Sequence, residues 1–98
     1  MMHVLVRHKV SDYNRWKEAF DSHLAARKRA GETGFRLFHN VEDPREIFVL
    51  SDWQTADEAR KFMNSEELRN AMAKAGVLGA PEVQYLEDAR SLHRTSAD

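Results

Sequence analysis

Four side chains that could carry proton-transfer chemistry on an aromatic compound fall on one side of the strands predicted by the sequence. They share one parity in the alternating pattern of those strands: His8, His39, Trp53 and Tyr85. A histidine near pH 7 can take a proton from a phenol or from an activated carbon acid, so His8 or His39 could act as a general base. Trp53 could stack on a flat substrate or donate its indole N–H, and Tyr85 could donate a hydrogen bond.

Each of these residues also has a purely structural interpretation. Histidines at strand ends are commonly half-solvated side chains without a chemical role. Trp53 could simply fill one end of the interior, and Tyr85 could belong to a subunit interface. Two histidines on one face count for more together than either does alone. We therefore keep His8 and His39 as candidate catalytic residues, with Trp53 and Tyr85 as candidate substrate-binding residues.

One arginine, Arg69, could bind the negative charge that proton removal creates. Its guanidinium can hold a carboxylate or a phenolate through two hydrogen bonds. Because Arg69 follows Glu66 and Glu67 on a predicted helix, it could instead bond its helix neighbours. Arg69 is thus a third candidate for substrate binding.

Composition and spacing argue against several kinds of site. The chain has no cysteine, which removes disulfides, thiolate metal sites, iron–sulfur clusters and a cysteine nucleophile. Its five histidines, at positions 3, 8, 23, 39 and 93, do not have the local spacing of metal ligands. There is no phosphate-binding loop, dinucleotide fingerprint or nucleophile elbow. We expect no metal and no cofactor, so any reaction would rely on acid–base chemistry and on the reactivity of the substrate.

The apolar periodicity predicts four strands and two helices that would position these residues. In order, they are a strand over 3–10, a helix from 12 to 30, strands over 35–41 and 47–53, a helix from 55 or 57 to 75 interrupted at 64–65, a tight connection over 76–81 and a strand over 82–88. Ser65 is the expected N-cap of the second helix's continuation, and Arg27 is expected on the outer face of the first helix. This order predicts a ferredoxin-like βαββαβ sandwich, an α+β fold whose antiparallel sheet carries both helices on one face.

The two faces of the predicted sheet differ in their expected partners. We expect the helices to cover the strand positions of one parity, namely Leu5, Phe38, Phe48, Leu50 and Leu86. The other parity, which includes the four candidate side chains on strands, is too apolar to face water. A second copy of the chain would cover it, which predicts a homodimer through the open sheet face and a barrel with room for a ligand.

Length and composition indicate one globular domain. Ninety-eight residues, 42% apolar and 32% charged, suit a single domain over 1–90 followed by a flexible C-terminal tail over 91–98. A net charge of −1 gives no field that would attract nucleic acid or an anionic membrane. The first residues lack the apolar core of a signal peptide, and no apolar run is long enough to span a bilayer, so we expect a cytoplasmic protein.

Several segments resemble the antibiotic biosynthesis monooxygenase-like group of dimeric α/β-barrel proteins. They are the helix start Asp12-Tyr-Asn-Arg-Trp16, the strand that ends in Trp53, and the stretch 65–72 followed by Gly76-Val-Leu-Gly79-Ala-Pro81. The resemblance covers almost the whole chain and implies a ferredoxin-like fold and a homodimer. The group contains cofactor-independent oxygenases, haem-degrading enzymes, isomerase-like or cyclase-like proteins and members of unknown role.

The quinone-forming oxygenases of this group use four side chains, and this sequence matches two of them. The position of their Trp is Trp53 and that of their Arg is Arg69, whereas their Asn falls at Val49 and their Tyr at Ala59. Val49 cannot hydrogen-bond a substrate oxygen. The resemblance therefore does not carry over the complete anthrone-oxidising site.

The haem-degrading members of the group hold iron with a His late in the second helix. That position here is Met72, and the Asn on their first strand would fall near His8. A methionine is a softer and weaker ligand and could equally be a core residue. We therefore expect no haem.

Together these observations predict a homodimeric barrel that binds a small, flat, largely apolar or aromatic molecule. It would act as a cofactor-independent monooxygenase, an oxidoreductase, or as a related proton-transfer enzyme on a polycyclic compound. His8 or His39 would be the base, and Arg69 would neutralise an oxyanion. The alternative is a non-catalytic ligand-binding or dimerisation module of unknown role.

Overall fold

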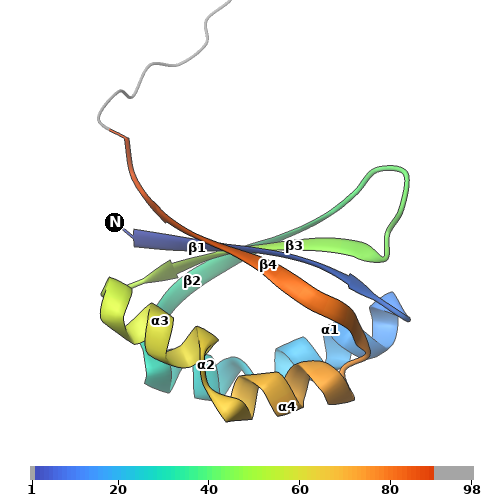
Figure 1. The fold of residues 1–98 in the computed structure, drawn as a ribbon, viewed down its shortest axis with the longest axis horizontal. Coiled ribbons are helices and arrows are strands. Elements are labelled where there is room, and N and C mark those ends of the chain that lie inside the picture. The colour runs from blue at the N-terminus through green and yellow to red at the C-terminus, as the bar shows by residue number, and fades with distance from the viewer. Residues whose placement is uncertain (1, 90–98) are drawn as a thin grey trace, which may run out of the picture.

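The computed structural model describes residues 2–89, which form four strands and four short helices (Figure 1). Their order is β1 (Met2–Val10), α1 (Tyr13–Ser22), α2 (Leu24–Ala30), β2 (Glu32–His39), β3 (Glu46–Trp53), α3 (Ala56–Met63), α4 (Glu66–Lys74) and β4 (Val77–Glu87). The predicted tail over 91–98 lies outside the described residues. In the described part of the chain, no helix has both the length and the apolar character needed to span a membrane.

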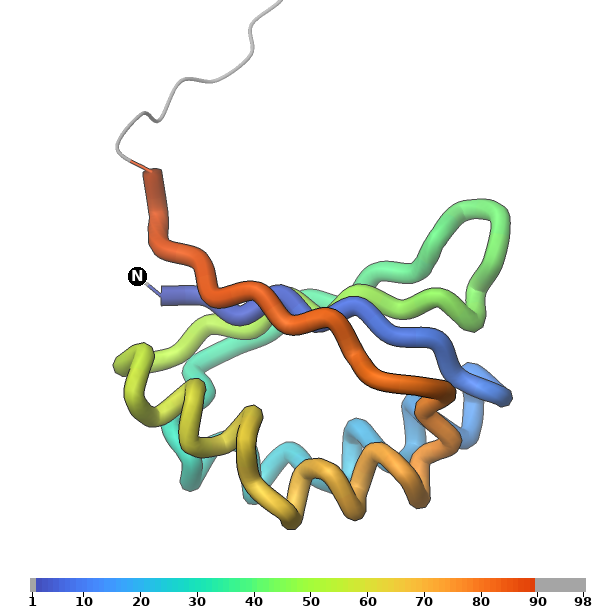
Figure 2. Tube along the Cα trace, in the orientation of Figure 1, coloured from blue at the N-terminus to red at the C-terminus, as the bar shows by residue number. Residues whose placement is uncertain are grey.

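The strands form one antiparallel sheet in the order β2-β3-β1-β4. The helices lie together on one face of this sheet, and the other face carries no second layer within residues 2–89 (Figures 1 and 2). β1 and β3 are the central strands, where Leu5 pairs with Leu50 and Val6 with Val49. This arrangement confirms the predicted α+β ferredoxin-like sandwich.

The first predicted helix is two helices in the structure. α1 begins after its N-cap Asp12, whose carboxylate accepts the backbone N–H of Arg15 at 3.4 Å, and it ends at His23. His23 has φ −92° and ψ 5°, outside the α-helical region, and its N–H donates to the carbonyl of Phe20 at 3.2 Å. Because α2 starts afresh after this break, its residues do not follow the orientation set by α1. Arg27 is consequently buried and not on the outer face as predicted.

The second predicted helix breaks where the sequence indicates. Thr55 accepts the N–H of Glu58 at 3.1 Å and caps α3, and Ser65 accepts the N–H of Leu68 at 3.1 Å and caps α4. The hydroxyl of Ser65 also donates to the carbonyl of Phe62 at 2.7 Å. Ser65 therefore satisfies the end of one helix and the start of the next, which confirms it as the predicted N-cap.

The assignment of the two sheet faces from the sequence is wrong. The helices cover the opposite parity, with the buried positions Val4, Val6, His8, Val10, Ile47, Val49, Ser51 and Trp53. The set expected beneath the helices lies on the open face, where Phe38 and Leu86 are 43% and 38% exposed. The reason is charge: Arg7, Lys9 and Arg36 share the open face and would be desolvated under the helices, whereas the covered positions of β1 and β3 carry no carboxylate, lysine or arginine.

β4 is longer than predicted, because most of segment 76–81 belongs to this strand instead of forming a connection. The register between β1 and β4 shifts at His8. Gly79, with φ 71°, lies in the shifted segment, in a conformation that favours glycine. The sheet is thus irregular beside one of the candidate bases, a placement common for β-bulges near functional sites.

Candidate functional site

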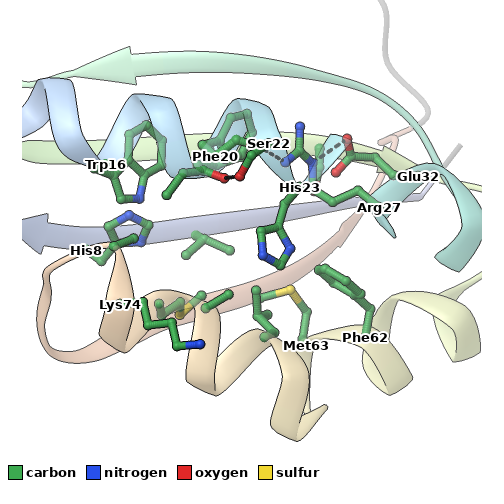
Figure 3. Close-up of a pocket in the computed structure, with 18 of the residues that line it drawn as sticks. His8, Trp16, Phe20, Ser22, His23, Arg27, Glu32, Phe62, Met63 and Lys74 are labelled. Carbon is green, nitrogen blue, oxygen red and sulfur yellow. Dashed lines mark hydrogen bonds and ion pairs between the residues drawn. The ribbon is translucent and has the colours of Figure 1, made fainter. Parts of the chain in front are cut away.

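A cavity of about 250 Å³ lies between the helices and the covered face of the sheet (Figure 3). Most of its wall is apolar, and its polar lining residues are His8, Ser22, His23, Arg27, Glu32, Ser51 and Lys74. Ligand sites are typically concave and apolar with a few polar groups that orient the ligand. Within residues 2–89, no three His, Cys, Asp or Glu side chains gather in a way that could hold a metal ion.

His8, from β1, is the most isolated polar group in this cavity. The residue is 6% exposed, and neither Nδ1 nor Nε2 has a hydrogen-bond partner among the described residues. Burial lowers the pKa of His8 to about 4, so the imidazole is neutral near pH 7. A neutral imidazole has one donor and one acceptor nitrogen. A ligand that reached the ring could therefore accept a hydrogen bond from one nitrogen and donate to the other.

Trp16 and Phe20 form an aromatic part of the cavity wall beside His8. They are four residues apart on α1 and so share one helix face, and their rings stack at 5.0 Å with an interplanar angle of 24°. The ring of Trp16 lies 5.5 Å from that of His8. Phe35 from β2 meets Phe20 edge-on at 5.1 Å. The rings of Trp16 and Phe20 give the cavity an apolar aromatic surface against which an aromatic ligand could pack.

Trp53 ends β3 beside the cavity, and its indole N–H is already used. The residue is 1% exposed, and its Nε1 donates to Oγ of Ser51 at 2.8 Å, which in turn donates to the carbonyl of Val4 at 3.3 Å. Its ring packs 5.4 Å from the ring of Phe62. Trp53 therefore offers the cavity an aromatic surface and not a free donor.

The other three sequence candidates do not line this cavity. His39 is exposed at the end of β2, where its Nδ1 donates to the carbonyl of Asn40 at 3.0 Å. Tyr85 is half-buried on β4, with the guanidinium carbon of Arg60 5.2 Å from its ring centroid. Arg69 is exposed on α4. Two of the five candidates meet at the cavity, and the roles assigned to the other three stay predictions.

Sequence reasoning missed two charged residues at the cavity, Arg27 on α2 and Glu32 on β2. Their side chains are 6% and 3% exposed, and Nε of Arg27 donates to Oε1 of Glu32 at 3.1 Å. Burial raises the pKa of Glu32, while the charge of Arg27 opposes that rise. The apolar stripe of the first predicted helix stops at Leu24. Because the apolar periodicity ends before Arg27, it could not predict which way this side chain points, and this is the one indication that the sequence gives.

Comparison with known proteins yields one family. A sequence model of the family described as antibiotic biosynthesis monooxygenase matches residues 1–74. Among curated proteins, none matches the chain.

Three solved structures illustrate the likeness of fold. A Bordetella bronchiseptica protein provisionally named antibiotic biosynthesis monooxygenase is 17% identical, with a TM-score of 0.77, over 90% of this chain and 96% of that one. SnoaB, a cofactor-independent oxygenase from Streptomyces nogalater, is 13% identical, with a TM-score of 0.75, over 95% and 97%. A Caulobacter crescentus protein with the same provisional name is 21% identical, with a TM-score of 0.68, over 91% and 90%. At these identities the likeness establishes a shared fold.

Proposed function

Because this chain belongs to the antibiotic biosynthesis monooxygenase family, we propose that it binds a small aromatic compound in its cavity and oxidises it without a cofactor, with His8 as proton acceptor. The observation that carries the proposal is the isolation of His8, whose ring nitrogens are buried at an apolar cavity without partners among the described residues. A buried donor or acceptor left unpaired costs about 1–3 kcal/mol. A ligand with a hydroxyl or carbonyl oxygen would recover that cost.

A neutral His8 is in the right protonation state to accept a proton, and the ligand determines its strength as a base. Without a charged partner its pKa is about 4, because burial disfavours the imidazolium. A phenolate or enolate within hydrogen-bond distance would stabilise the imidazolium, since opposite charges attract strongly in a medium of low dielectric constant. Proton transfer from ligand to His8 would thus create an ion pair that is neutral as a whole.

The oxidation would need only the substrate and molecular oxygen. Removal of a proton from an activated CH₂ group or a phenol gives an anion that can pass electrons to O₂. Conversion of the CH₂ group to a carbonyl consumes one O₂ and releases one water, and the substrate supplies all four electrons. One oxygen atom enters the carbonyl and the other leaves as water. The apolar walls around the ligand would keep bulk water from the anion.

A second copy of the chain would cover the open sheet face. Apolar side chains from every strand lie on that face, namely Leu5, Phe38, Phe48, Leu50 and Leu86. Two such sheets packed across a two-fold axis would form a barrel and give each copy the same contacts. The cavity lies beneath the helices, on the other face, so the partner would support the sheet without lining the cavity.

Calorimetric titration with 2-naphthol, a neutral two-ring aromatic with one hydroxyl, tests ligand binding at His8. We expect the wild type to bind it and His8→Phe, which keeps a ring but removes both nitrogens, to bind it about tenfold more weakly. His39→Phe tests the second candidate base, and a histidine outside the cavity should not change the affinity. Equal affinities for His8→Phe and the wild type would remove His8 from the ligand site.

Oxygen uptake with anthrone separates catalysis from binding. Anthrone has an activated CH₂ group, and its oxidation to anthraquinone takes up one O₂ and releases one water. Above the rate without protein, we expect catalysed uptake that falls by about 100-fold or more in His8→Phe. Binding of both compounds without any catalysed uptake would instead support the alternative function, a non-catalytic ligand-binding module.

A further inference from the structure

The guanidinium of Arg27 is a buried positive charge in the cavity wall, and some of its N–H donors are not used. Its side chain is more than nine-tenths buried, and its Nη2 has no hydrogen-bond partner in the part of the chain that the structure describes. This nitrogen carries two N–H groups. A charged donor left unpaired in an apolar setting is costly. The arrangement therefore calls for an acceptor that enters from outside the chain.

Three contacts fix the guanidinium of Arg27 before any ligand arrives. Nε donates to Glu32 at 3.1 Å, and Nη1 donates to the carbonyl of Phe20 at 2.5 Å. The guanidinium carbon also lies 3.7 Å from the centroid of the Phe20 ring. With Nε and Nη1 occupied, Nη2 is the nitrogen left for a ligand. A donor held in place in advance binds with a smaller loss of conformational entropy.

A continuous row of rings joins Arg27 to His8 along the wall of the cavity. The steps are 3.7 Å from Arg27 to Phe20, 5.0 Å from Phe20 to Trp16 and 5.5 Å from Trp16 to His8. Figure 3 shows His8 and Trp16 toward one end of this row, and Arg27 with Glu32 toward the other. The rings of Trp16 and Phe20 thus lie between two unpaired polar groups, one near each end of the cavity.

The charged residues that line the cavity favour an anionic ligand over a cationic one. Glu32 balances the charge of Arg27, and Lys74 lines the same cavity without a carboxylate among the other lining residues. The charged lining groups therefore leave one positive charge in excess. A guanidinium has donors only, so the group that it recognises is an acceptor. Its hydrogen bonds to carboxylates are among the strongest that proteins make.

We propose that Arg27 is a ligand-binding residue and that the ligand is an aromatic carboxylate, whose acid group bonds Nη2 of Arg27 while an oxygen at its opposite end meets His8. This inference rests on the proposed function, because it adds a second anchor to the same cavity. It narrows the substrate class from small aromatic compounds to aromatic acids with a distant hydroxyl or carbonyl oxygen. It also explains why Arg27 and Glu32 form a buried ion pair. Stability alone does not explain such a pair, because apolar residues of similar volume often stabilise a fold equally well.

Three matched probes test the inference on the wild-type protein by calorimetry at neutral pH. The first is 6-hydroxy-2-naphthoate, which has a hydroxyl at one end and a carboxylate at the other. Its methyl ester keeps the shape without the charge, and 2-naphthol lacks the acid group altogether. We expect the carboxylate to bind about tenfold or more tightly than either neutral probe, as charge-assisted hydrogen bonds imply.

A double variant, Arg27→Gln with Glu32→Gln, tests the residue itself. It removes both charges of the pair together, because loss of Arg27 alone would leave Glu32 buried without its partner and could unfold the chain. We expect it to keep its affinity for 2-naphthol and to lose the preference for the carboxylate over the ester. Arg29→Gln, an exposed arginine on the same helix that does not line this cavity, is the matched control and should keep the full preference.

The outcomes separate this inference from the proposed function. The inference is overturned if the wild type binds carboxylate and ester equally, or if the preference survives in the double variant. Binding of 2-naphthol that depends on His8, with no gain from the carboxylate, overturns the inference and leaves the proposed function in place. Failure of the wild type to bind any of the three probes overturns both.

Discussion

His8 lowers the stability of the fold at every pH at which its side chain is protonated in the unfolded chain but neutral in the native chain. Its pKa is about 4 in the folded protein, because burial disfavours the charged ring, against an ordinary value of 6.5. Between these two values the unfolded state binds more protons than the native state. Stability therefore rises with pH across this range and falls as the pH drops through it, by about 3 kcal/mol in all.

His8→Phe should remove this sensitivity to acid. Urea denaturation gives the free energy of unfolding of the variant and of the wild type at each pH. The difference, variant minus wild type, should be about 2–3 kcal/mol larger at pH 4.5 than at pH 7.5. His3 acts in the opposite sense, because hydrogen bonds to Asp88 and Asp52 raise its pKa and so stabilise the native state at low pH. Comparing variant with wild type at each pH cancels that effect. A difference that stays constant with pH would contradict a buried neutral His8.

The alternating pattern of the strands was enough to predict that two of the five candidate site residues, His8 and Trp53, lie on the same face of the sheet. Parity places His8 and Trp53 on one face of the sheet whichever face the helices cover, so the error in the faces did not separate them. Parity says nothing of position along a strand, and His39 lies at the exposed end of β2, outside the cavity. Arg27 was beyond this reasoning, because its orientation depends on a helix break that the pattern does not reveal.

The two helix breaks show what local sequence can and cannot predict. Ser65 carries its own signal, since a serine before a helical stretch has a hydroxyl that can accept a backbone N–H. His23 has no such signal: its side chain makes no capping hydrogen bond at the start of α2. Packing of both segments against the sheet, and not the residue itself, must favour the break there. Boundaries set by tertiary contacts are the part of the fold that the sequence left undetermined.

Ser65→Ala should loosen α4 and weaken the fold by about 1 kcal/mol. The change removes the acceptor for the N–H of Leu68 and the donor to the carbonyl of Phe62. Urea denaturation measures the loss, and hydrogen exchange should show faster exchange in the first turn of α4. Ser22→Ala is the matched control, because that hydroxyl only bonds the carbonyl of Ala19 within its own helix. Equal stability of the two variants would mean that Ser65 does not hold the junction.

At the scale of the whole molecule, the open sheet face combines apolar side chains with an arginine, Arg7, whose charge is already paired. Arg7 donates to Glu46 at 2.7 Å and to Glu82 at 2.6 Å, across three strands. Charges paired in this way cost less to bury against a partner than isolated ones. A chain of 98 residues also buries a limited fraction of its surface alone. Both features favour a second copy as the cover of this face.

Leu50→Glu should therefore convert a dimer into a folded monomer. Leu50 pairs with Leu5 and Arg36 at the centre of the open face, so a glutamate there could pair with Arg36 in the monomer. In a two-fold dimer the change would bury two new carboxylates, one from each copy, and should weaken association by about 100-fold or more. Light scattering after size-exclusion chromatography measures the mass of each form. Val41→Glu, at a position 95% exposed in the loop between β2 and β3, is the control and should stay dimeric. A monomeric wild type, or a Leu50→Glu protein that still dimerises, would show that this face is not the subunit contact.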